Sequence, residues 1–185
     1  MNEINFKKID KDNLELACKI QNEIFPKEDA RQNYIEQINK ASYRKEIDYY
    51  IVYNGNTPIG VTGIYSYPEY SNIAWLGWFG ILEKFRNNGY GSIALDKTIE
   101  LAKVKGYREF RLYTDEYATI AHKLYASRGL IKELYDNPND KDKYIDAKIY
   151  IYSKNLDNSP ISKWNNKLLG LKEQSDKEHN LHNII

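Results

Sequence analysis

The feature that most constrains the fold is an apolar, strand-like run that leads through a glycine turn into a helix. The run covers residues 73–82, and the turn from Arg86 to Gly91 has the spacing R-x-x-G-x-G. Glycine has no Cβ, so Gly89 and Gly91 let the backbone turn sharply and let an anion approach the amide N–H groups. The first N–H groups of a helix lack intrahelical partners, and the helix dipole favours negative charge there. The turn therefore predicts a phosphate site, although on spacing alone a plain turn explains it equally well.

The elements after the turn make this run part of a βαβ unit. Apolar residues at helical spacing predict a helix from Gly89 to about Lys105, and Gly106 is a suitable residue to end it. Phe110 and Leu112 mark the next strand. Two strands joined by a helix in one sheet are parallel, with a right-handed connection.

The rest of the chain alternates between strand-like and helix-like patterns. It predicts strands at 4–9, 49–53, 59–67, 130–135 and 143–152, and helices at 14–24, 30–44 and 118–128. Asn54-Gly55 between two β-rich runs is a hairpin signal. After Lys154 the chain becomes polar. We therefore expect an α/β domain in residues 1–154 and an extension in residues 155–185, with a short helix around 161–169 and a frayed tail from residue 170.

Composition limits the class of protein. The 185 residues suit one domain, and 27 Lys and Arg against 26 Asp and Glu give a net charge of +1. This balance argues against nucleic acid or an anionic membrane as partner. Neither a signal peptide nor an apolar span is evident, and the single Cys18 suits a reducing compartment, so we expect a cytoplasmic protein. The three histidines show no metal-ligand spacing, so we expect no metal.

Two motifs in this order resemble the GNAT superfamily of N-acetyltransferases. The first is the turn at 86–91, and the second is the segment 121–130, in which Leu124, Tyr125 and Gly129 fit the pattern A-x-x-L-Y-x-x-x-G-[FL]. The resemblance covers about residues 4–154. It implies a mixed sheet of about seven strands flanked by about four helices, whose strands near Leu82 and Leu112 splay apart to hold the pantetheine arm of acetyl-CoA.

The resemblance also implies which residues hold the cosubstrate, acetyl-CoA. The residues expected at the pyrophosphate are Arg86, Asn87, Asn88, Gly89, Tyr90, Gly91 and Ser92. The backbone of Phe79, Gly80 and Ile81 would pair with the pantetheine amides like an added strand. A backbone N–H of the same strand would stabilise the oxyanion.

The catalytic residue that the resemblance implies is Tyr125, as the proton donor to the CoA thiolate. A phenol stays protonated at neutral pH and can donate to sulfur. The alternative is that Tyr125, one of 17 tyrosines, only packs against the sheet. The general base stays open between Glu69, Asp115, Glu116 and a chain of water molecules. Ala118 stands where many relatives carry an asparagine that holds the cofactor, and Thr119 or Lys123 could compensate.

For the acceptor substrate, the sequence predicts only a chemical class. The region where relatives admit it contains Phe25, Glu28, Asp29, Tyr34, Tyr65, Tyr67, Glu69 and Trp78. Aromatic walls with a few carboxylates suit a cationic amine, while an ordinary aromatic core with solvated acids explains them as well. We expect a primary amine of a small molecule, or of a peptide. The rival hypothesis is a non-catalytic CoA-binding regulatory or interaction module, and both a monomer and a homodimer remain open.

Overall fold

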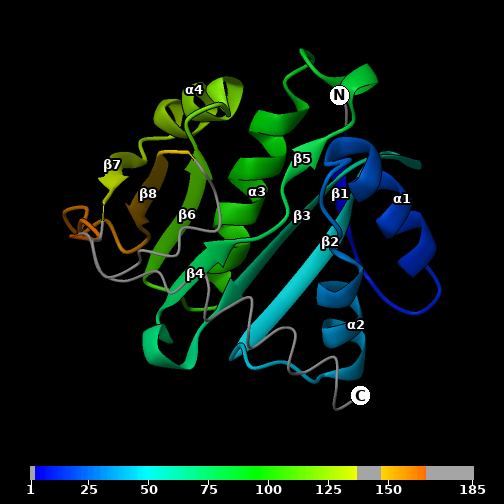
Figure 1. Cartoon of the computed structure of the whole chain (residues 1–185), viewed down its shortest axis with the longest axis horizontal. Helices are drawn as coiled ribbons and strands as arrows, with labels where there is room; N and C mark the ends of the chain where they lie inside the picture. Colours follow the sequence, from blue (N-terminus) through cyan, green and yellow to red (C-terminus); the bar gives the residue numbers. More distant parts are fainter. Residues whose placement is uncertain (1–2, 137–146, 166–185) are drawn as a thin grey trace. The chain divides into compact units, whose positions relative to one another are not determined.

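The computed structural model describes residues 3–136 and 147–165 (Figure 1). The chain divides into two compact units, residues 1–108 and 109–185. Across the described residues the elements are those of the expected mixed α/β class. None of the helices in these parts of the chain has the length and apolar character that a membrane crossing needs. The predicted domain boundary at Lys154 stays a prediction.

The first unit contains an antiparallel sheet. Its strands are β1 (Ile4–Lys8), β2 (Glu46–Asn54), β3 (Thr57–Ser66) and β4 (Ile73–Leu76), in that spatial order, and β5 (Gly80–Ile81) also pairs with β3. The hairpin expected at Asn54-Gly55 is confirmed, because Asn54 pairs with Thr57 across a two-residue turn. Gly55 has φ +56°, the left-handed conformation that such a turn needs at its first position.

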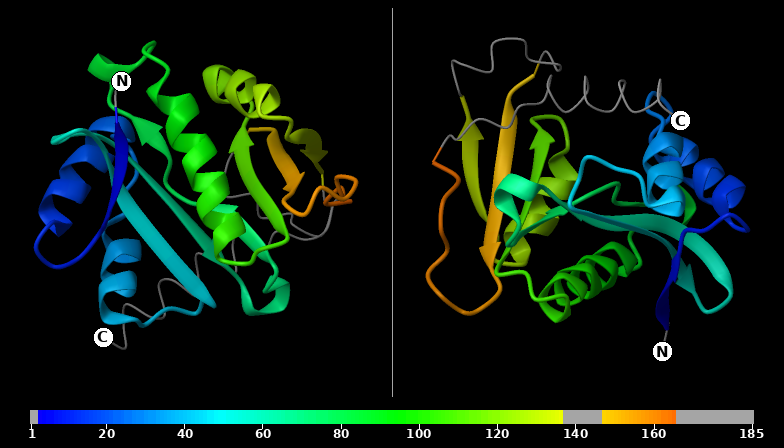
Figure 2. Two further views of the ribbon diagram at one scale, coloured as in Figure 1. Left: turned by 180° about the vertical axis from the view of Figure 1, so that it is seen from behind. Right: turned by 90° about the horizontal axis from the view of Figure 1, so that it is seen from below.

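Three helices cover the two faces of this sheet. They are α1 (Leu14–Ile24), α2 (Arg31–Asn39) and α3 (Tyr90–Val104). Two short 3-10 turns lie in the connections, η1 (Pro68–Tyr70) between β3 and β4 and η2 (Glu83–Phe85) between β5 and α3. Ile51 packs with α1 and α2, whereas its neighbour Val52 packs with α3. Successive strand residues point to opposite faces, so α1 and α2 lie on one face and α3 on the other (Figure 2).

The helix expected at 30–44 is shorter in the structure. Lys40 adopts a left-handed conformation (φ 54°), and its N–H donates to Gln37 O at 3.3 Å. The N–H of Ala41 donates to Glu36 O at 3.0 Å. This pair of bonds closes the last turn as a Schellman motif, so the helix ends at Asn39.

The prediction of one continuous strand over residues 73–82 is wrong. Ile64 of β3 pairs with Leu76, but Gly60 pairs with Ile81, so residues 77–79 lie opposite residues 62–63, three against two. A β-bulge therefore separates β4 from β5. A Cβ on Gly77 would lie 2.4 Å from Cε1 of Tyr49, so only glycine fits where the bulge passes this ring.

The second unit contains three strands that pair antiparallel. Its strands β6 (Glu109–Asp115), β7 (Ile131–Tyr135) and β8 (Ile149–Asn155) lie in the order β6, β8, β7, and α4 (Thr119–Ser127) connects β6 to β7. These elements agree with the expected strands and helix, although residues 143–146 of the last predicted strand lie outside the described residues. Of the short helix expected at 161–169, residues 161–165 are not helical, and the remainder lies outside the described residues, as does the predicted tail from residue 170.

Candidate active site

The turn between β5 and α3 is held by its own side chains. Nε of Arg86 donates to Ile81 O at 2.9 Å, which fixes the arginine over the end of β5. Nδ2 of Asn88 donates to Arg86 O at 2.9 Å. Arg86 is exposed, and a guanidinium has five N–H donors, so this bond leaves others for an anion.

Two residues of this turn have left-handed backbone conformations. Gly89, the N-cap of α3, has φ +77°, and Asn87 has φ +63°. The first backbone bond of the helix runs from Ile93 N–H to Gly89 O at 3.2 Å, so the amides before Ile93 point beyond the end of the helix. Sequence reasoning expected the glycine but not the conformation of Asn87; asparagine is one of the few residue types that adopts it readily. The geometry is that of an anion-binding helix start.

Not every predicted cofactor residue offers its side chain to a ligand. The Tyr90 ring is 9% exposed and lies in the core between α3 and the sheet, with its hydroxyl accepting a bond from Nδ2 of Asn54 at 3.0 Å. Ile81 lies in the same core. These two residues can therefore meet a ligand only through their backbone. At Gly80, a Cβ would lie 2.5 Å from Cγ2 of Ile24, so packing against α1 requires glycine there.

Within the first unit, β5 pairs with β3 only. The second edge of β5 therefore pairs with no other described strand of that unit. The bulge at residues 77–79 also interrupts the regular ladder just before Gly80. This edge of Phe79, Gly80 and Ile81 has the backbone groups that an added strand would use.

Tyr125 lies on α4 in the second unit and is 6% exposed. Its ring packs against that of Tyr152, with centroids 5.3 Å apart and planes tilted by 58°. Burial, together with the neighbouring Tyr152, raises the pKa of Tyr125 above its ordinary value. The phenol is thus protonated at neutral pH and able to donate.

The carboxylates considered as bases have other partners or lie in solvent. Oδ1 of Asp115 accepts from the N–H groups of Tyr117 and Ala118, at 2.8 and 3.1 Å. It therefore supports the start of α4, where Ala118 is the N-cap and has no side-chain bond of its own. Oε1 of Glu116 accepts from Lys148 N–H at 3.0 Å, and Glu69 is exposed on η1. The geometry assigns none of them as the base.

The aromatic residues considered for the acceptor lie largely in the core. Tyr34 is fully buried against Tyr49, and Tyr65 and Tyr67 are at most 8% exposed. Phe25 and Trp78 are the half-buried exceptions.

Phe25 and Trp78 form one cluster, with ring centroids 5.5 Å apart. Nε1 of Trp78 donates to Oδ1 of Asn33 at 2.8 Å, which fixes the indole. Glu28 and Asp29 are exposed, and Oδ1 of Asp29 accepts from Arg31 N–H at 2.8 Å. Of the predicted acceptor residues, the aromatic side chains of Trp78 and Phe25 thus remain partly exposed.

Sequence reasoning missed a buried ion pair next to Tyr65. Nη1 of Arg44 lies 3.6 Å from Oε2 of Glu36, with side chains 6% and 0% exposed. The guanidinium lies over the rings of Tyr43 and Tyr65, 5.1 and 4.9 Å from their centroids. The predicted acceptor residue Tyr65 therefore already faces a cation of its own chain.

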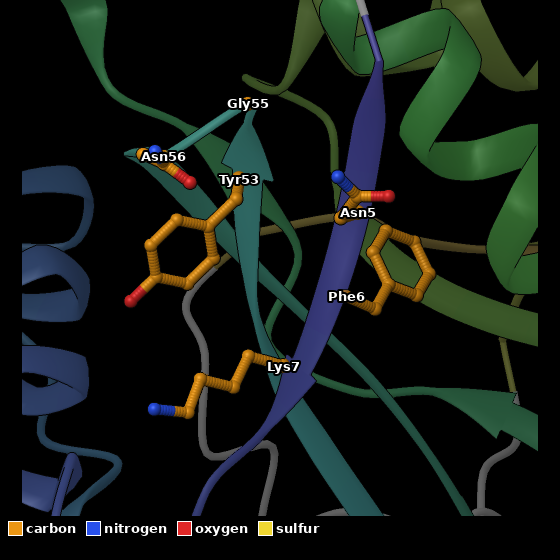
Figure 3. Close-up of a pocket in the computed structure, with 6 residues that line it drawn as sticks. All are labelled: Asn5, Phe6, Lys7, Tyr53, Gly55 and Asn56. Carbon is orange, nitrogen blue, oxygen red and sulfur yellow. The ribbon is translucent and has the colours of Figure 1, made fainter.

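A shallow hollow on the first unit lies away from these residues. It has a volume of about 280 Å³ and is lined by Asn5, Phe6 and Lys7 of β1 and by Tyr53, Gly55 and Asn56 around the hairpin turn (Figure 3). The side chains of Tyr53 and Lys7 extend to one side of β1 and that of Phe6 to the other. No predicted site residue lines it. Among the residues described, no three His, Cys, Asp or Glu side chains are grouped as metal ligands.

Comparison with known proteins connects this geometry to a family. The model of the acetyltransferase (GNAT) family matches residues 14–130. Among curated proteins, none matches the sequence. Solved structures with this fold include a GNAT-family acetyltransferase of Staphylococcus aureus Mu50, which is 18% identical with a TM-score of 0.64; the match covers 83% of this chain and 99% of that one.

Two further solved structures contain the cosubstrate or its product. An acetyltransferase of Bacillus subtilis in complex with CoA is 15% identical, with a TM-score of 0.63, over 84% of this chain and 99% of that one. A GNAT-family acetyltransferase of Elizabethkingia anophelis with acetyl-CoA bound is 18% identical, with a TM-score of 0.64, over the same shares of the two chains. Because the family model spans both the turn at 86–91 and the motif at 121–130, the chain belongs to the GNAT family of acetyltransferases.

Proposed function

We propose that this protein transfers the acetyl group of acetyl-CoA to a primary amine of a small molecule or of a peptide. The observation that carries the proposal is the start of α3, where left-handed Asn87 and Gly89 direct amides outward beside the exposed Arg86. Such a helix start suits a diphosphate. Family membership and the relatives crystallised with CoA and acetyl-CoA support this identity of the donor.

In this proposal the residues of the turn bind the pyrophosphate. Asn87, Asn88, Tyr90 and Ser92 contribute backbone N–H groups, and Arg86 contributes charge. The edge of Phe79, Gly80 and Ile81 that faces away from β3 binds the pantetheine amides. None of these residues needs to bind a metal ion, because the thioester is already activated for attack.

The proposed reaction is direct attack. The neutral amine nitrogen forms a bond to the thioester carbonyl carbon, and a backbone N–H of the strand at 79–81 stabilises the oxyanion. When the tetrahedral intermediate collapses, the C–S bond breaks and the thiolate takes the phenol proton of Tyr125. The surplus proton of the amine leaves to water, and the Tyr125 phenolate regains a proton from water, so that the net products are the amide and the CoA thiol. Tyr125 can take the role of acid because its phenol is protonated at neutral pH.

The proposal also includes the cellular compartment in which the reaction takes place. The thiol of Cys18 is free and buried, and burial raises its pKa, as expected of an inert cysteine in a reducing compartment. We therefore propose a cytoplasmic enzyme.

A second candidate function is a CoA-binding module without catalysis. The observation that favours it is the state of the carboxylates: Asp115 and Glu116 accept bonds from backbone N–H groups, and Ala118 offers no polar side chain. A module of this kind would bind CoA and acetyl-CoA alike, and no amine would speed the release of thiol above slow hydrolysis.

The test combines binding with turnover. Acetyl-CoA should raise the melting temperature with a dependence on its concentration, by mass action. The absence of a shift at millimolar acetyl-CoA would exclude both candidates. If acetyl-CoA binds, free thiol is measured with a panel of primary amines that includes alkyl diamines and short peptides. Release that depends on one amine supports the transferase, whereas equally slow hydrolysis with every amine supports the module.

A further inference from the structure

His122 lies one helical turn before Tyr125 on α4, and both of its ring nitrogens have partners in the second unit. Nε2 lies 2.9 Å from the carbonyl oxygen of Asp115 at the end of β6. Nδ1 lies 2.8 Å from the hydroxyl of Tyr152 on β8. A single imidazole therefore links α4 to two strands of the sheet.

The chemistry of these partners sets the direction of both bonds. A carbonyl oxygen only accepts, so Nε2 carries the hydrogen and donates to Asp115 O. In the neutral ring Nδ1 is then an acceptor, so the O–H of Tyr152 donates to it. Burial raises the pKa of Tyr152, which keeps its phenol in the donor form.

Tyr152 in turn is a direct neighbour of the proposed acid. It is 1% exposed on β8, which pairs with both β6 and β7, and its ring packs on that of Tyr125 at 5.3 Å. Loss of the His122 bond would release the hydroxyl end of Tyr152 and leave a buried polar group without a partner. The orientation of the ring that supports Tyr125 thus depends on His122.

We propose that His122 is a positioning residue for acetyl transfer, and that it acts by holding Tyr152, which holds the ring of Tyr125. The inference rests on the proposed function of Tyr125 as proton donor. Proton transfer to the leaving sulfur needs the phenol at a defined distance and angle, and a displacement of about 1 Å can cost about a hundredfold in rate. His122 itself need not touch either substrate.

The first test separates positioning from folding. His122→Phe keeps a ring and deletes both bonds, and Tyr152→Phe keeps a ring and deletes the hydroxyl. Each should lower kcat by about ten- to a hundredfold while KM for acetyl-CoA stays within about twofold, measured as thiol release with the best amine of the panel. The matched control is Tyr150→Phe on the same strand, because the Tyr150 ring meets His122 at 5.5 Å and 87°, and it should change neither constant.

The double variant His122→Phe/Tyr152→Phe gives the decisive comparison. It removes both partners of the bond, so its melting temperature should recover above that of the single variants. If His122 positions Tyr125, kcat should stay as low as in the single variants. Recovery of kcat together with stability would overturn the proposal, as would unchanged kcat in His122→Phe.

A conservative variant covers the case in which His122→Phe does not fold. His122→Asn retains a side-chain carbonyl that can accept from Tyr152 in place of Nδ1. It should keep kcat within about threefold of the original, because the bond to Tyr152 is the one that matters. A loss in His122→Asn as large as in Tyr152→Phe would contradict the route through Tyr152.

A measurement without turnover separates this inference from the proposed function. With 13Cζ-labelled tyrosine, the resonance of Tyr125 is assigned as the one missing in Tyr125→Phe. It should shift in Tyr152→Phe and His122→Phe and stay in place in Tyr150→Phe. If no amine is acetylated, the proposed function fails while this readout still reports on the support of Tyr125. An unmoved Tyr125 resonance in His122→Phe would overturn the positioning role even in an active enzyme.

Discussion

Gly89 and Gly106 bracket helix α3 with the same backbone conformation, φ +77° before its first residue and φ +85° just after its end. A Cβ at either position would meet no atom within 4 Å. The two glycines therefore carry the same strain when substituted, while only Gly89 lies at the end of the helix where an anion would bind. This pair provides a matched test of the cofactor site.

Gly89→Ala and Gly106→Ala should each lose about 1–2 kcal/mol of stability, because a Cβ is disfavoured in the left-handed region. Only Gly89→Ala should also weaken acetyl-CoA binding, by about tenfold or about 1.4 kcal/mol, since relief of the strain turns the first amides of α3 away from the pyrophosphate. Thermal unfolding gives the first quantity and calorimetric titration the second. Equal affinities in the two variants would argue against a pyrophosphate at this helix start.

Arg86→Gln should lower the affinity for acetyl-CoA by about three- to tenfold and flatten its dependence on salt, because one charged contact to phosphate is lost. Its melting temperature should change little, since Arg86 is exposed. Titrations at two salt concentrations measure both effects. Lys84→Gln, which removes a nearby exposed cation on η2, serves as control. An equal loss of affinity in both variants would mean that the general positive potential of the region attracts acetyl-CoA, and that Arg86 makes no specific contact with it.

Tyr125→Phe should lower kcat by about a hundredfold or more and leave the Kd of acetyl-CoA within about twofold, because only a proton donor is removed. Since the pKa of the Tyr125 phenol is raised, it stays protonated as pH rises, and ionisation of this group should cause no fall in rate below about pH 10. A pH profile of thiol release measures this. A Tyr125→Phe protein with full turnover would remove Tyr125 from the mechanism.

Asp48 should make the stability of the first unit depend on pH. Burial acts to raise its pKa, but hydrogen bonds from Lys105 and Lys8 outweigh this and hold the pKa below its ordinary value. A carboxyl group whose pKa is lower in the folded state than in the unfolded state stabilises the protein at pH above its unfolded-state pKa, near 3.9. This stabilisation is lost as pH falls through the folded-state pKa. The melting temperature should therefore drop at pH below about 4.

Asp48→Asn should remove part of that drop and cost about 1–2 kcal/mol at neutral pH, where it leaves two lysines without their shared carboxylate. Thermal unfolding between pH 7 and pH 3 is the measurement. Asp12→Asn, at an exposed position, is the control and should leave the profile unchanged. An unaltered profile in Asp48→Asn would show that other carboxylates carry the acid sensitivity.

Most of the fold could be predicted because its signals are local. Asn54-Gly55 and Gly106 each determine a turn through their own backbone conformation, and the period of apolar residues identifies α1 and α3. The bulge after β4 could not be predicted in this way, since it depends on Gly77 passing the ring of Tyr49, which is distant in sequence.

The candidate site divides in the same manner. The turn at Gly89 is encoded locally, and it was found. The hydrogen bond proposed to position Tyr125 is not encoded locally, because it joins His122 to Tyr152, which lies 30 positions away in the sequence. The available signal was the spacing of His122, one helical turn before Tyr125, which puts both on one side of α4. The buried pair of Arg44 and Glu36 had no such signal, since it forms only because α2 ends at Asn39, earlier than its sequence pattern predicts.

The measurement that tests the central claim most directly is isothermal titration calorimetry of the protein with acetyl-CoA. A second titration is carried out in the presence of inorganic pyrophosphate as a competitor. The account predicts one site per chain and displacement by pyrophosphate, since both ligands would use the amides at the start of α3. Absence of binding at millimolar acetyl-CoA would contradict the assignment of this turn as the seat of a CoA diphosphate.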